Sequence, residues 1–474
     1  MQELFALSGG TVFLQHAAYG GAFRLARQVQ IWYQSAMEGC PSCFVEEVFA
    51  SAAASASSSL AKLLGGGKGD FVPVPTAAHS LHAVLTSGQF GSGDRLILSS
   101  ITSPAARNVA VRWAARLGAE IGEVILDQEI LQSRSRILQA FEAALAGISG
   151  VKLAILDHVC TFPPVVLPIR EITSLCHRYG CKVWVDGSDA VGGLPVDIPT
   201  LGVQFYTADL SKWFCAPKGA SFLWVHRREQ GNVRPVVASQ GSGLSFQQEF
   251  VWTGAGDLSA WMAIPAAGKI FQLLGFSEIR RRNLWLLQSA TNLLLAAWES
   301  VELLGLEEDG VPAAAVSLPN VPDRMVSHDV AWELHRGLRI RYAIEASIKC
   351  WKGRLWVQIS ANLYNCIQEY ERLAHAVPKL LEQFDQSTSR PTRPPSPPPG
   401  FMAPPPGFDT PCYKPAPKYK PPKPVPRSPP QIDHVAQPMP PVEPEDPASS
   451  YPPVVRTYGW GGTIAAQHSN QDFA

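Results

Sequence analysis

Two segments of the sequence place reactive side chains directly after short apolar runs. The first, VWVDGSDAVG at residues 183–192, contains Asp186, and the second, FYTADLSKWFCAPKG at residues 205–219, contains Lys212. A lysine withdrawn from water can form an imine with a carbonyl group and then carry a proton, because burial favours its neutral form. Taken singly, Lys212 could be an ordinary surface lysine and Asp186 a loop cap, so the elements around them must decide.

Strand-like and helix-like patterns alternate around these residues. Apolar runs of strand length occur at residues 95–99, 152–156 and 182–185, and helical patterns follow at residues 105–117 and 169–179. Apolar runs separated by helices are typical of a mainly parallel sheet that is covered on both faces, so we predict an α/β fold. Such sheets bind ligands at the carboxyl ends of their strands, which is where Asp186 stands.

The pattern changes after about residue 274. A long helix at residues 277–298, strands at 338–342 and 354–359 and a final helix at 368–384 indicate a smaller α+β domain. We divide the chain into an N-terminal segment (1–22), a large domain (23–265), a small domain (266–385) and a tail (386–474). The tail holds 25 of the 41 prolines, a density that favours disorder or polyproline II over helices and central strands.

Composition argues against several classes of function. The hydrophobic share of 46% allows a large core, and Lys+Arg balances Asp+Glu at 40 each, which favours neither nucleic acid nor an anionic membrane as a partner. Neither a signal peptide nor an apolar run of roughly 18 residues is visible, so we expect a cytoplasmic protein. The nine cysteines, Cys40 and Cys43 of the one CxxC pair included, are expected to be free thiols without a metal.

Both reactive segments resemble the class V aminotransferases, in particular the isopenicillin N epimerase-like and cysteine lyase-like branch of that family. The family has Asp-Gly/Ala-x-His-x-x-Gly at the end of a strand and, further along, His-Lys-Trp followed by Ala-Pro-x-Gly. Three other segments match family motifs in the family's order: FLQHAAYG at 13–20, WTGAGD at 252–257 and ISANLYN at 359–365. The resemblance covers about residues 12–384 and implies a fold type I large domain with a mainly parallel seven-stranded sheet.

The resemblance also implies a cofactor, pyridoxal 5′-phosphate (PLP), and roles for four residues. Lys212 becomes the Schiff-base lysine, and Asp186 the carboxylate that keeps the cofactor's ring nitrogen protonated so that the ring can accept electrons. The family's phosphate loop aligns with residues 72–78, where Thr76 and the amide of Ala77 are the candidate ligands. A simple helix cap is an equally good interpretation of Thr76 alone.

Other positions beside the expected cofactor depart from the family pattern. Asp189 and Ser211 stand where the family has histidines, whereas His158 matches a family histidine and could alternatively be a core residue. Ala255 replaces a threonine that reaches the phosphate of the partner chain, and Gln358 replaces the arginine that grips an amino-acid carboxylate. A neutral amide cannot form the bidentate, charge-assisted pair that the arginine forms.

Two functions therefore stay open. The first is a PLP enzyme that acts on an amino acid or amine, by lyase chemistry on cysteine or an S-substituted cysteine or by epimerisation. Given Gln358, either the substrate is unusual, or another arginine such as Arg341 or Arg107 compensates, or the site has lost turnover. No aromatic or histidine residue for stacking on the ring falls in residues 100–103. The second function is a catalytically weak family member that serves as a scaffold for the proline-rich tail.

Partner expectations come from the resemblance and from the tail. The family places sites across a twofold interface, so we expect a homodimer in which residues 252–257 reach the neighbouring subunit. The tail repeats PPPGF at residues 397–401 and 404–408, which could dock on a proline-recognition domain. A merely solvating extension is the simpler interpretation of the tail.

Overall fold

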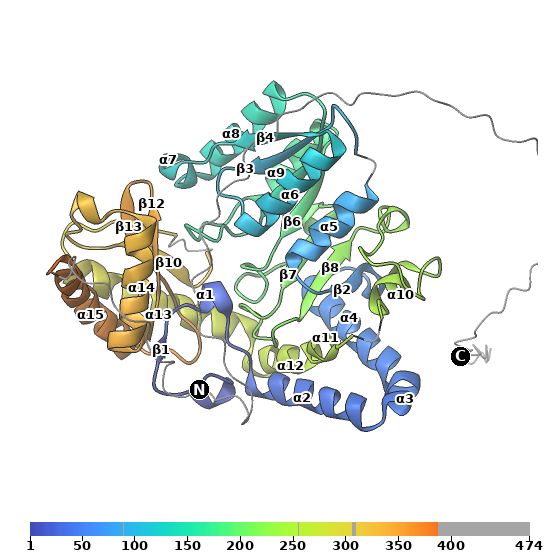
Figure 1. The fold of residues 1–474 in the computed structure, drawn as a ribbon, viewed down its shortest axis with the longest axis horizontal. Helices are drawn as coiled ribbons and strands as arrows, with labels where there is room; N and C mark the ends of the chain where they lie inside the picture. Colours follow the sequence, from blue (N-terminus) through green and yellow to red (C-terminus); the bar gives the residue numbers. More distant parts are fainter. Residues whose placement is uncertain (89, 255, 306–309, 387–474) are drawn as a thin grey trace, which may run out of the picture. The chain divides into compact units, whose positions relative to one another are not determined.

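A seven-stranded sheet forms the centre of the large domain (Figure 1). The computed structural model describes residues 1–88, 90–254, 256–305 and 310–386. Strand β8 runs antiparallel to both of its neighbours, β2 and β7, and the other four pairs are parallel, so the sheet is mainly parallel, as predicted. In spatial order the strands are β2 (Phe71–Val74), β8 (Ser221–Val225), β7 (Phe205–Asp209), β6 (Lys182–Asp186), β5 (Val151–Asp157), β3 (Arg95–Ser99) and β4 (Glu120–Val124).

Helices cover both faces of this sheet because its central strands are apolar on both sides. In β5, Leu153 and Ile155 enter one core, and Ala154 and Leu156 enter the other. The first core is closed by α5 (Ala77–Ser87), α6 (Pro104–Leu117) and α10 (Phe246–Val251). The second is closed by α4 (Ala50–Leu64), α8 (Arg134–Gly147), α9 (Ile169–Arg178), α11 (Ser259–Met262) and α12 (Ile264–Leu274).

The small domain has its own core and lies beside the large sheet in Figure 1. Its four-stranded antiparallel sheet has the order β12-β13-β10-β9. The strands are β9 (Leu303–Leu304), β10 (Ala313–Ser317), β12 (Ser347–Trp351) and β13 (Arg354–Ser360), and the helices are α13 (Phe276–Ala297), α14 (His328–Tyr342) and α15 (Ile367–Gln386).

The strand expected at residues 338–342 is wrong, because these residues form the last turns of α14. The alternation Leu-Arg-Ile-Arg-Tyr has the period of a strand, yet Ile340 is 48% exposed and only Leu338 of the two aliphatic residues is buried. Leu338 continues a helical series with Ala331 and Leu334, and the Ser327 hydroxyl caps the helix by accepting from the Val330 amide. Helical burial therefore overrode the local alternation.

The N-terminal segment connects the two domains. Strand β1 (Val12–Phe13) pairs in parallel with β11 (Ile344–Glu345) of the small domain. After α1 (His16–Tyr19), the Phe23 amide donates to the Cys215 carbonyl of the large domain, and α2 (Arg24–Gly39) then packs against α11 and α12. The segment thus fixes the small domain close to the loop that carries Lys212.

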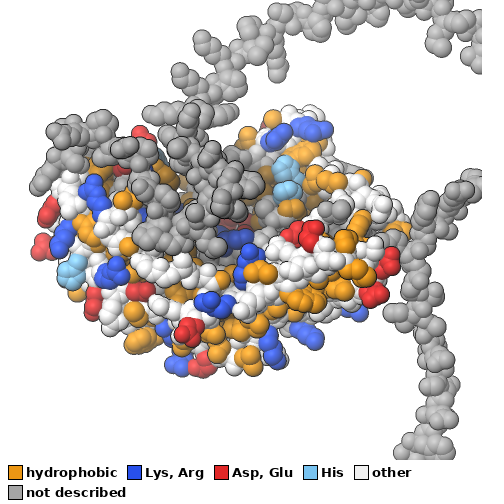
Figure 2. Space-filling model, turned by 60° about the horizontal axis from the view of Figure 1, so that its bottom comes forward, with side chains coloured by type: hydrophobic (Ala, Val, Ile, Leu, Met, Phe, Trp, Pro, Cys, Tyr) orange, Lys and Arg blue, Asp and Glu red, His pale blue; other side chains and the backbone are white. Residues whose placement is uncertain are grey.

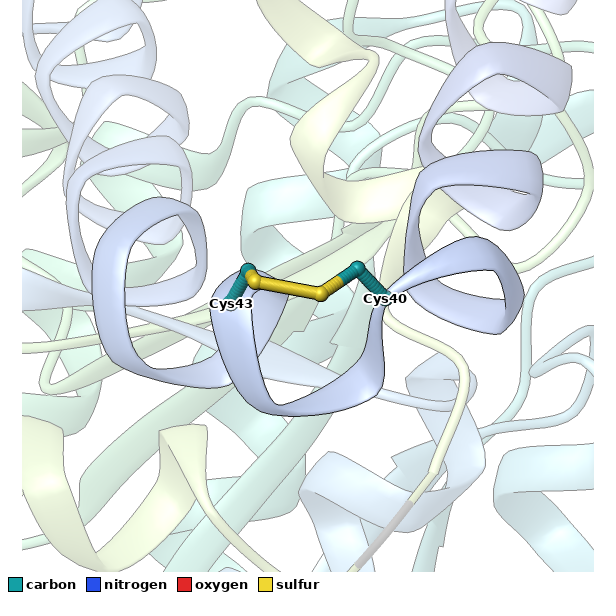
Figure 3. The surroundings of a disulfide bond; sticks show 2 residues. All are labelled: Cys40 and Cys43. Atoms are coloured by element: carbon teal, nitrogen blue, oxygen red, sulfur yellow. A yellow bond between two sulfur atoms is a disulfide. The ribbon is translucent and has the colours of Figure 1, made fainter.

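Cys40 and Cys43 are joined by a disulfide (Figure 3), which corrects the expectation that all cysteines are free thiols. Cys40 ends α2, and Cys43 ends the short helical turn α3 (Pro41–Cys43). One turn of chain brings the two Cα atoms to 5.5 Å, within the range that a disulfide can bridge. Among the other cysteines of the described residues, the free thiols include Cys176, Cys181, Cys215, Cys350 and Cys366.

Two sequence expectations concern residues that the structure does not describe. Ala255 and both PPPGF repeats of the tail lie outside the described residues. Within the described residues, no helix is long and apolar enough to span a membrane. The same residues contain no group of three or more His, Cys, Asp or Glu side chains that could bind a metal ion.

The close approach of the N-terminal segment to the Lys212 loop generates a test. Gly20 has φ +64°, and a Cβ there would overlap the carbonyl oxygen of Ser211. We expect Gly20→Ala to lower the free energy of unfolding by about 3 kcal/mol or more, because strained backbone adds to the overlap. Urea unfolding measures this loss. Gly9→Ala is the matched control, since nothing lies within 4 Å of its added Cβ, and an equal effect of both substitutions would contradict the packing described.

Candidate active site

Lys212 lies in the loop after β7, where its side chain meets the residues that follow β6. Its Nζ donates to Oδ2 of Asp189 at 2.8 Å, and the two side chains are only 17% and 10% exposed. Asp186 ends β6, and its Oδ1 accepts from the Ser188 amide at 2.9 Å. The two segments singled out in the sequence therefore do converge at the carboxyl ends of neighbouring strands.

A chain of hydrogen bonds fixes these two loops relative to each other. The Asp209 amide donates to Oγ of Ser188 at 2.8 Å, and Oδ1 of Asp209 accepts from the Ser211 amide at 2.9 Å. Ser211 is buried and takes part in this chain of bonds through its backbone amide, and its predicted place beside the cofactor stays a prediction. These hydrogen bonds hold the loops of Asp186 and Lys212 together.

The charge state of Lys212 differs from the expectation based on burial alone. Burial lowers the pKa of its ammonium, but the carboxylates of Asp189, Asp186 and Asp209 outweigh this effect, so the pKa of Lys212 is raised. The amine is therefore protonated at neutral pH in this arrangement. A reaction that uses its lone pair must first loosen the bond to Asp189 or transfer a proton.

A third carboxylate, Asp157, ends the adjacent strand β5 and is paired in register with Asp186. Burial and then the nearby Asp186 raise the pKa of Asp157 to about 7, although its Oδ2 accepts from the Ser103 amide at 3.0 Å. Burial likewise raises the pKa of Asp186. This edge of the sheet favours a bound cation that would stabilise the ionised carboxylates.

His158 is buried beside these carboxylates. Its amide donates to the Asp186 carbonyl at 2.8 Å, and its Nδ1 lies 2.8 Å from the Tyr206 hydroxyl. Burial lowers the pKa of His158 to about 4, so the ring is neutral. Tyr206 was not singled out from the sequence. Its hydroxyl would overlap a Cβ at Gly187, which explains why the residue after Asp186 has no side chain.

The expected phosphate residues lie at the start of α5, directly after β2. The Thr76 hydroxyl accepts from the His79 amide at 3.4 Å, so Thr76 is the N-cap, and Ala77 begins the helix. The helix is joined to β6, because Nε1 of Trp184 donates to Oγ of Ser80 at 3.2 Å. Free amides at a helix start suit an anion, and the phosphate role of Thr76 and Ala77 stays a prediction.

Three residues of the N-terminal and C-terminal motifs support the Lys212 backbone. Nε2 of His16 lies 3.2 Å from the Lys212 carbonyl oxygen and 2.9 Å from Nδ2 of Asn362. Nδ1 of the same ring lies 2.9 Å from the Tyr364 hydroxyl. Burial lowers the pKa of His16 to about 3, so the ring is a neutral, fully enclosed bridge. The motifs were visible in the sequence, but their joint position was not.

Gln358 faces the loop that leads away from His158. Its Nε2 donates to the Thr161 carbonyl at 3.1 Å, and the Thr161 hydroxyl donates to Oδ2 of Asp189 at 3.4 Å. Thr161, which the sequence did not single out, therefore links the small domain to the Lys212 ion pair. Gln358 is therefore one residue away from the Asp189–Lys212 pair, which agrees with its alignment with the family arginine.

Neither arginine that was expected to compensate for Gln358 does so. Arg341 is exposed on α14 and donates to Gln383 at 2.9 Å on the neighbouring helix α15. Arg107 donates to the Ser99 carbonyl at 2.7 Å and pairs with Glu123 at 2.6 Å. Both guanidinium groups are already used elsewhere, because sequence patterns do not reveal which face of a helix a long side chain takes.

The family model of aminotransferase class V matches residues 45–373. The chain belongs to this family. An Oryza sativa subsp. japonica protein provisionally named L-cysteine desulfhydrase 2 is 32% identical over 343 residues, which cover 65% of this chain and 69% of the relative. Isopenicillin N epimerase of Streptomyces clavuligerus is 27% identical over 348 residues, covering 69% and 83% of the two chains. The predicted family and branch are thereby confirmed.

A solved structure with the same fold is the complex of the cystine C-S lyase C-DES with its product cysteine persulfide. It has a TM-score of 0.67 and 16% identity and covers 79% of this chain and 98% of its own. A C-DES mutant with glycine covalently linked to its PLP cofactor has the same TM-score at 18% identity, with coverage of 79% and 97%. These likenesses support the predicted fold type.

The raised pKa of Asp157 predicts how stability depends on pH when no ligand is bound. Between its ordinary pKa of 3.8 and about 7, the folded protein binds more protons than the unfolded chain, so stability falls as pH rises through this window. Asp157→Asn keeps an oxygen for the Ser103 amide but removes the charge. At pH 8 it should be more stable than the wild type by up to roughly 4 kcal/mol, with little difference at pH 4.

Thermal unfolding of ligand-free protein across pH 4–8 measures this difference. Asp329→Asn, at an exposed carboxylate on α14, is the control and should follow the wild type. Parallel pH profiles for wild type and Asp157→Asn would show that Asp157 does not titrate in this window.

Proposed function

We propose that this chain is a PLP-dependent lyase that cleaves the Cβ–S bond of L-cysteine or an S-substituted cysteine. With L-cysteine and water, the products are pyruvate, ammonia and hydrogen sulfide. The proposal is supported by the family, by the desulfhydrase name of the rice relative at 32% identity and by the convergence of Lys212, Asp189 and Asp186. That convergence is the observation that carries it.

The residues present fit the cofactor. Asp186 is a carboxylate whose ionised form is disfavoured by burial, and a protonated ring nitrogen would supply the cation it lacks. Lys212 lies on the next strand's loop with its amine pointed into the same carboxylate cluster. Thr76 and Ala77 offer a hydroxyl and a helix N-terminus for the phosphate. When bound, PLP supplies an electron sink for the carbanion at the substrate Cα.

The chain's own residues then divide the work. Asp186 holds the proton on the ring nitrogen, and the Lys212 amine takes the proton from the substrate Cα. Asp189 Oδ2 accepts a hydrogen bond from Nζ of Lys212, so Asp189 can keep the free lysine within reach of the reacting carbon. The low exposure of Lys212 and Asp189 excludes most water, which strengthens each of these charge interactions.

Epimerisation is the second candidate, favoured by the Streptomyces relative at 27% identity. It begins with the same proton removal but returns a proton to the opposite face of Cα and releases no sulfur. A screen of cysteine and its S-substituted derivatives for pyruvate and sulfide separates the two reactions. Pyruvate and sulfide support the lyase, whereas the opposite enantiomer without sulfide release would replace it by the epimerase.

Substitution of Lys212 tests the cofactor assignment. Wild-type protein incubated with PLP should show the visible absorbance of a lysine-linked cofactor, and borohydride should fix the cofactor on the peptide that contains Lys212. Lys212→Ala should lose this absorbance and the activity, because the imine-forming amine is gone. Lys152→Ala, at an exposed lysine of β5, should behave as the wild type. Covalent cofactor retained in Lys212→Ala would refute the assignment.

We also propose that the working unit is a homodimer. Leu25 and Trp32 are 40% and 58% exposed and lie seven residues apart on one side of α2. The neighbouring helix α12 exposes Leu273 and Leu274 at its end. Figure 2 turns this side of the molecule forward, and hydrophobic side chains gather on it. A patch of this kind supports an interface with a second copy.

Sedimentation at micromolar concentration measures the oligomeric state. We expect a dimer for the wild type and a shift toward monomer for Trp32→Glu, because a buried charge at the interface is unfavourable. Trp332→Glu is the matched control, since Trp332 is 52% exposed on α14. A stable wild-type monomer would overturn the dimer proposal.

A further inference from the structure

Lys349 is a partly buried cation on the sheet face that looks toward Lys212. It lies on β12, directly opposite Trp356 of β13, and the next pair in the same ladder is Ser347 with Gln358. Residues opposite each other in an antiparallel pair share a face of the sheet, and so do residues two apart on one strand. Lys349 is therefore the diagonal neighbour of Gln358, about 7–8 Å away between Cα atoms.

The loop that receives Gln358 also receives Lys349. Nζ of Lys349 lies 5.0 Å from the centre of the Phe162 ring, and the residue before Phe162 is Thr161, whose carbonyl accepts from Gln358 and whose hydroxyl donates to Asp189. Asp189 in turn holds Lys212. Three contacts thus connect the Lys349 ammonium to the reactive lysine.

No carboxylate neutralises Lys349 within the part of the chain that the structure describes. None of the hydrogen bonds or ion pairs of those residues involves its Nζ, and the Phe162 ring is its close partner. Burial lowers the pKa of Lys349, Asp189 raises it, and Lys212 lowers it further, so all three groups share one electrostatic environment. A cation withdrawn from water without an ion-pair partner is unfavourable to the fold until an anion reaches it.

We propose that Lys349 binds the carboxylate of the amino-acid substrate, in the role left empty by Gln358. This inference rests on the proposed function, because only an amino-acid substrate brings the carboxylate. The other anion of the complex, the cofactor phosphate, is expected at the start of α5 on the large domain and so does not compete for Lys349. A lysine gives a single, flexible charge contact where an arginine would give two fixed hydrogen bonds, so orientation of the substrate depends more on the surrounding wall.

That wall is aromatic. The Phe162 and Trp351 rings meet edge to face at 5.9 Å, and Trp351 meets Trp356 at 6.2 Å. All three lie on the same side as Lys349, with Phe162 supplied by the large domain. Trp356 is buried behind the other two, so a substrate held by Lys349 would lie against the partly buried rings of Phe162 and Trp351. This arrangement favours amino acids with an apolar or thioether side chain over strongly polar ones.

The test compares two ligands that differ only in the carboxylate. L-alanine and ethylamine are titrated into full-length, PLP-loaded protein, and cofactor absorbance reports binding without turnover. Lys349→Met, which keeps the apolar stem, should weaken L-alanine binding by about 10- to 100-fold, the range expected for a charge-assisted contact. Ethylamine binding should not weaken, and Lys349→Arg should retain most of the affinity for L-alanine. Lys152→Met, on an exposed strand position, is the control and should match the wild type.

Two further readouts separate this role from a structural one. Lys349→Met should unfold at the wild-type temperature or above, because it removes an unpaired charge, whereas a structural lysine would leave a less stable protein. PLP uptake should be unchanged. Equal loss of both ligands, or loss of PLP, would place Lys349 at the cofactor and overturn the inference. Unchanged L-alanine binding in an active, PLP-loaded Lys349→Met protein would overturn the Lys349 inference but leave the proposed function standing. Wild-type protein that takes up no PLP would overturn both.

Discussion

The buried charges at the carboxyl ends of β5, β6 and β7 constrain the rest of this structure. Asp157, Asp186 and Asp189 converge there. The ammonium of Lys212 donates a hydrogen bond to one of them, Asp189. Burial is the main cause that raises the pKa of Asp157 and of Asp186, and a neighbouring carboxylate adds to it in each case, Asp186 beside Asp157 and Asp189 beside Asp186. Such a cluster is tolerated only when rigid loops hold its members and when a cation can join it. Under the proposed function, the protonated ring nitrogen of PLP would be that cation, and cofactor binding would then relieve the charge repulsion as well.

Support for this cluster comes from parts of the chain that are far apart in sequence. His16 from the N-terminal segment and Asn362 and Tyr364 from the small domain meet at the Lys212 backbone. Gly20 passes so close to Ser211 that no side chain fits. The small domain contributes Gln358 through Thr161. Because these contacts bridge both domains, a shift of the small domain would be transmitted to the Lys212 backbone.

Three strands of the central sheet, at residues 95–99, 152–156 and 182–185, could be predicted from the sequence because buried strands are read as continuous apolar runs. The number of seven strands was implied by the resemblance to the family. The strand–loop positions of Asp186 and Lys212 followed from the same pattern together with the family motifs. Residues 338–342 were assigned wrongly because five residues are too few to separate a strand's alternation from the last turns of a helix. Lys349, Thr161 and Tyr206 could not be found, since each acts through a neighbour supplied by another strand or domain, and register between such strands is not visible in local periodicity.

The departures from the family pattern make sense together rather than one at a time. With aspartate at position 189 instead of histidine, the site gains a negative charge that Lys212 uses as a hydrogen-bond partner. With glutamine at position 358 instead of arginine, it loses a positive charge, and the amide ties the small domain to the Thr161 carbonyl. Both changes make the net charge of the site more negative, which opposes the entry of an amino-acid carboxylate. A cation at position 349, on the same face as Gln358 and beside Phe162, offsets one of these charges where the substrate would enter. The arrangement thus divides the work between two residues: Gln358 fixes the geometry between the domains, and Lys349 supplies the charge that the family arginine would bring.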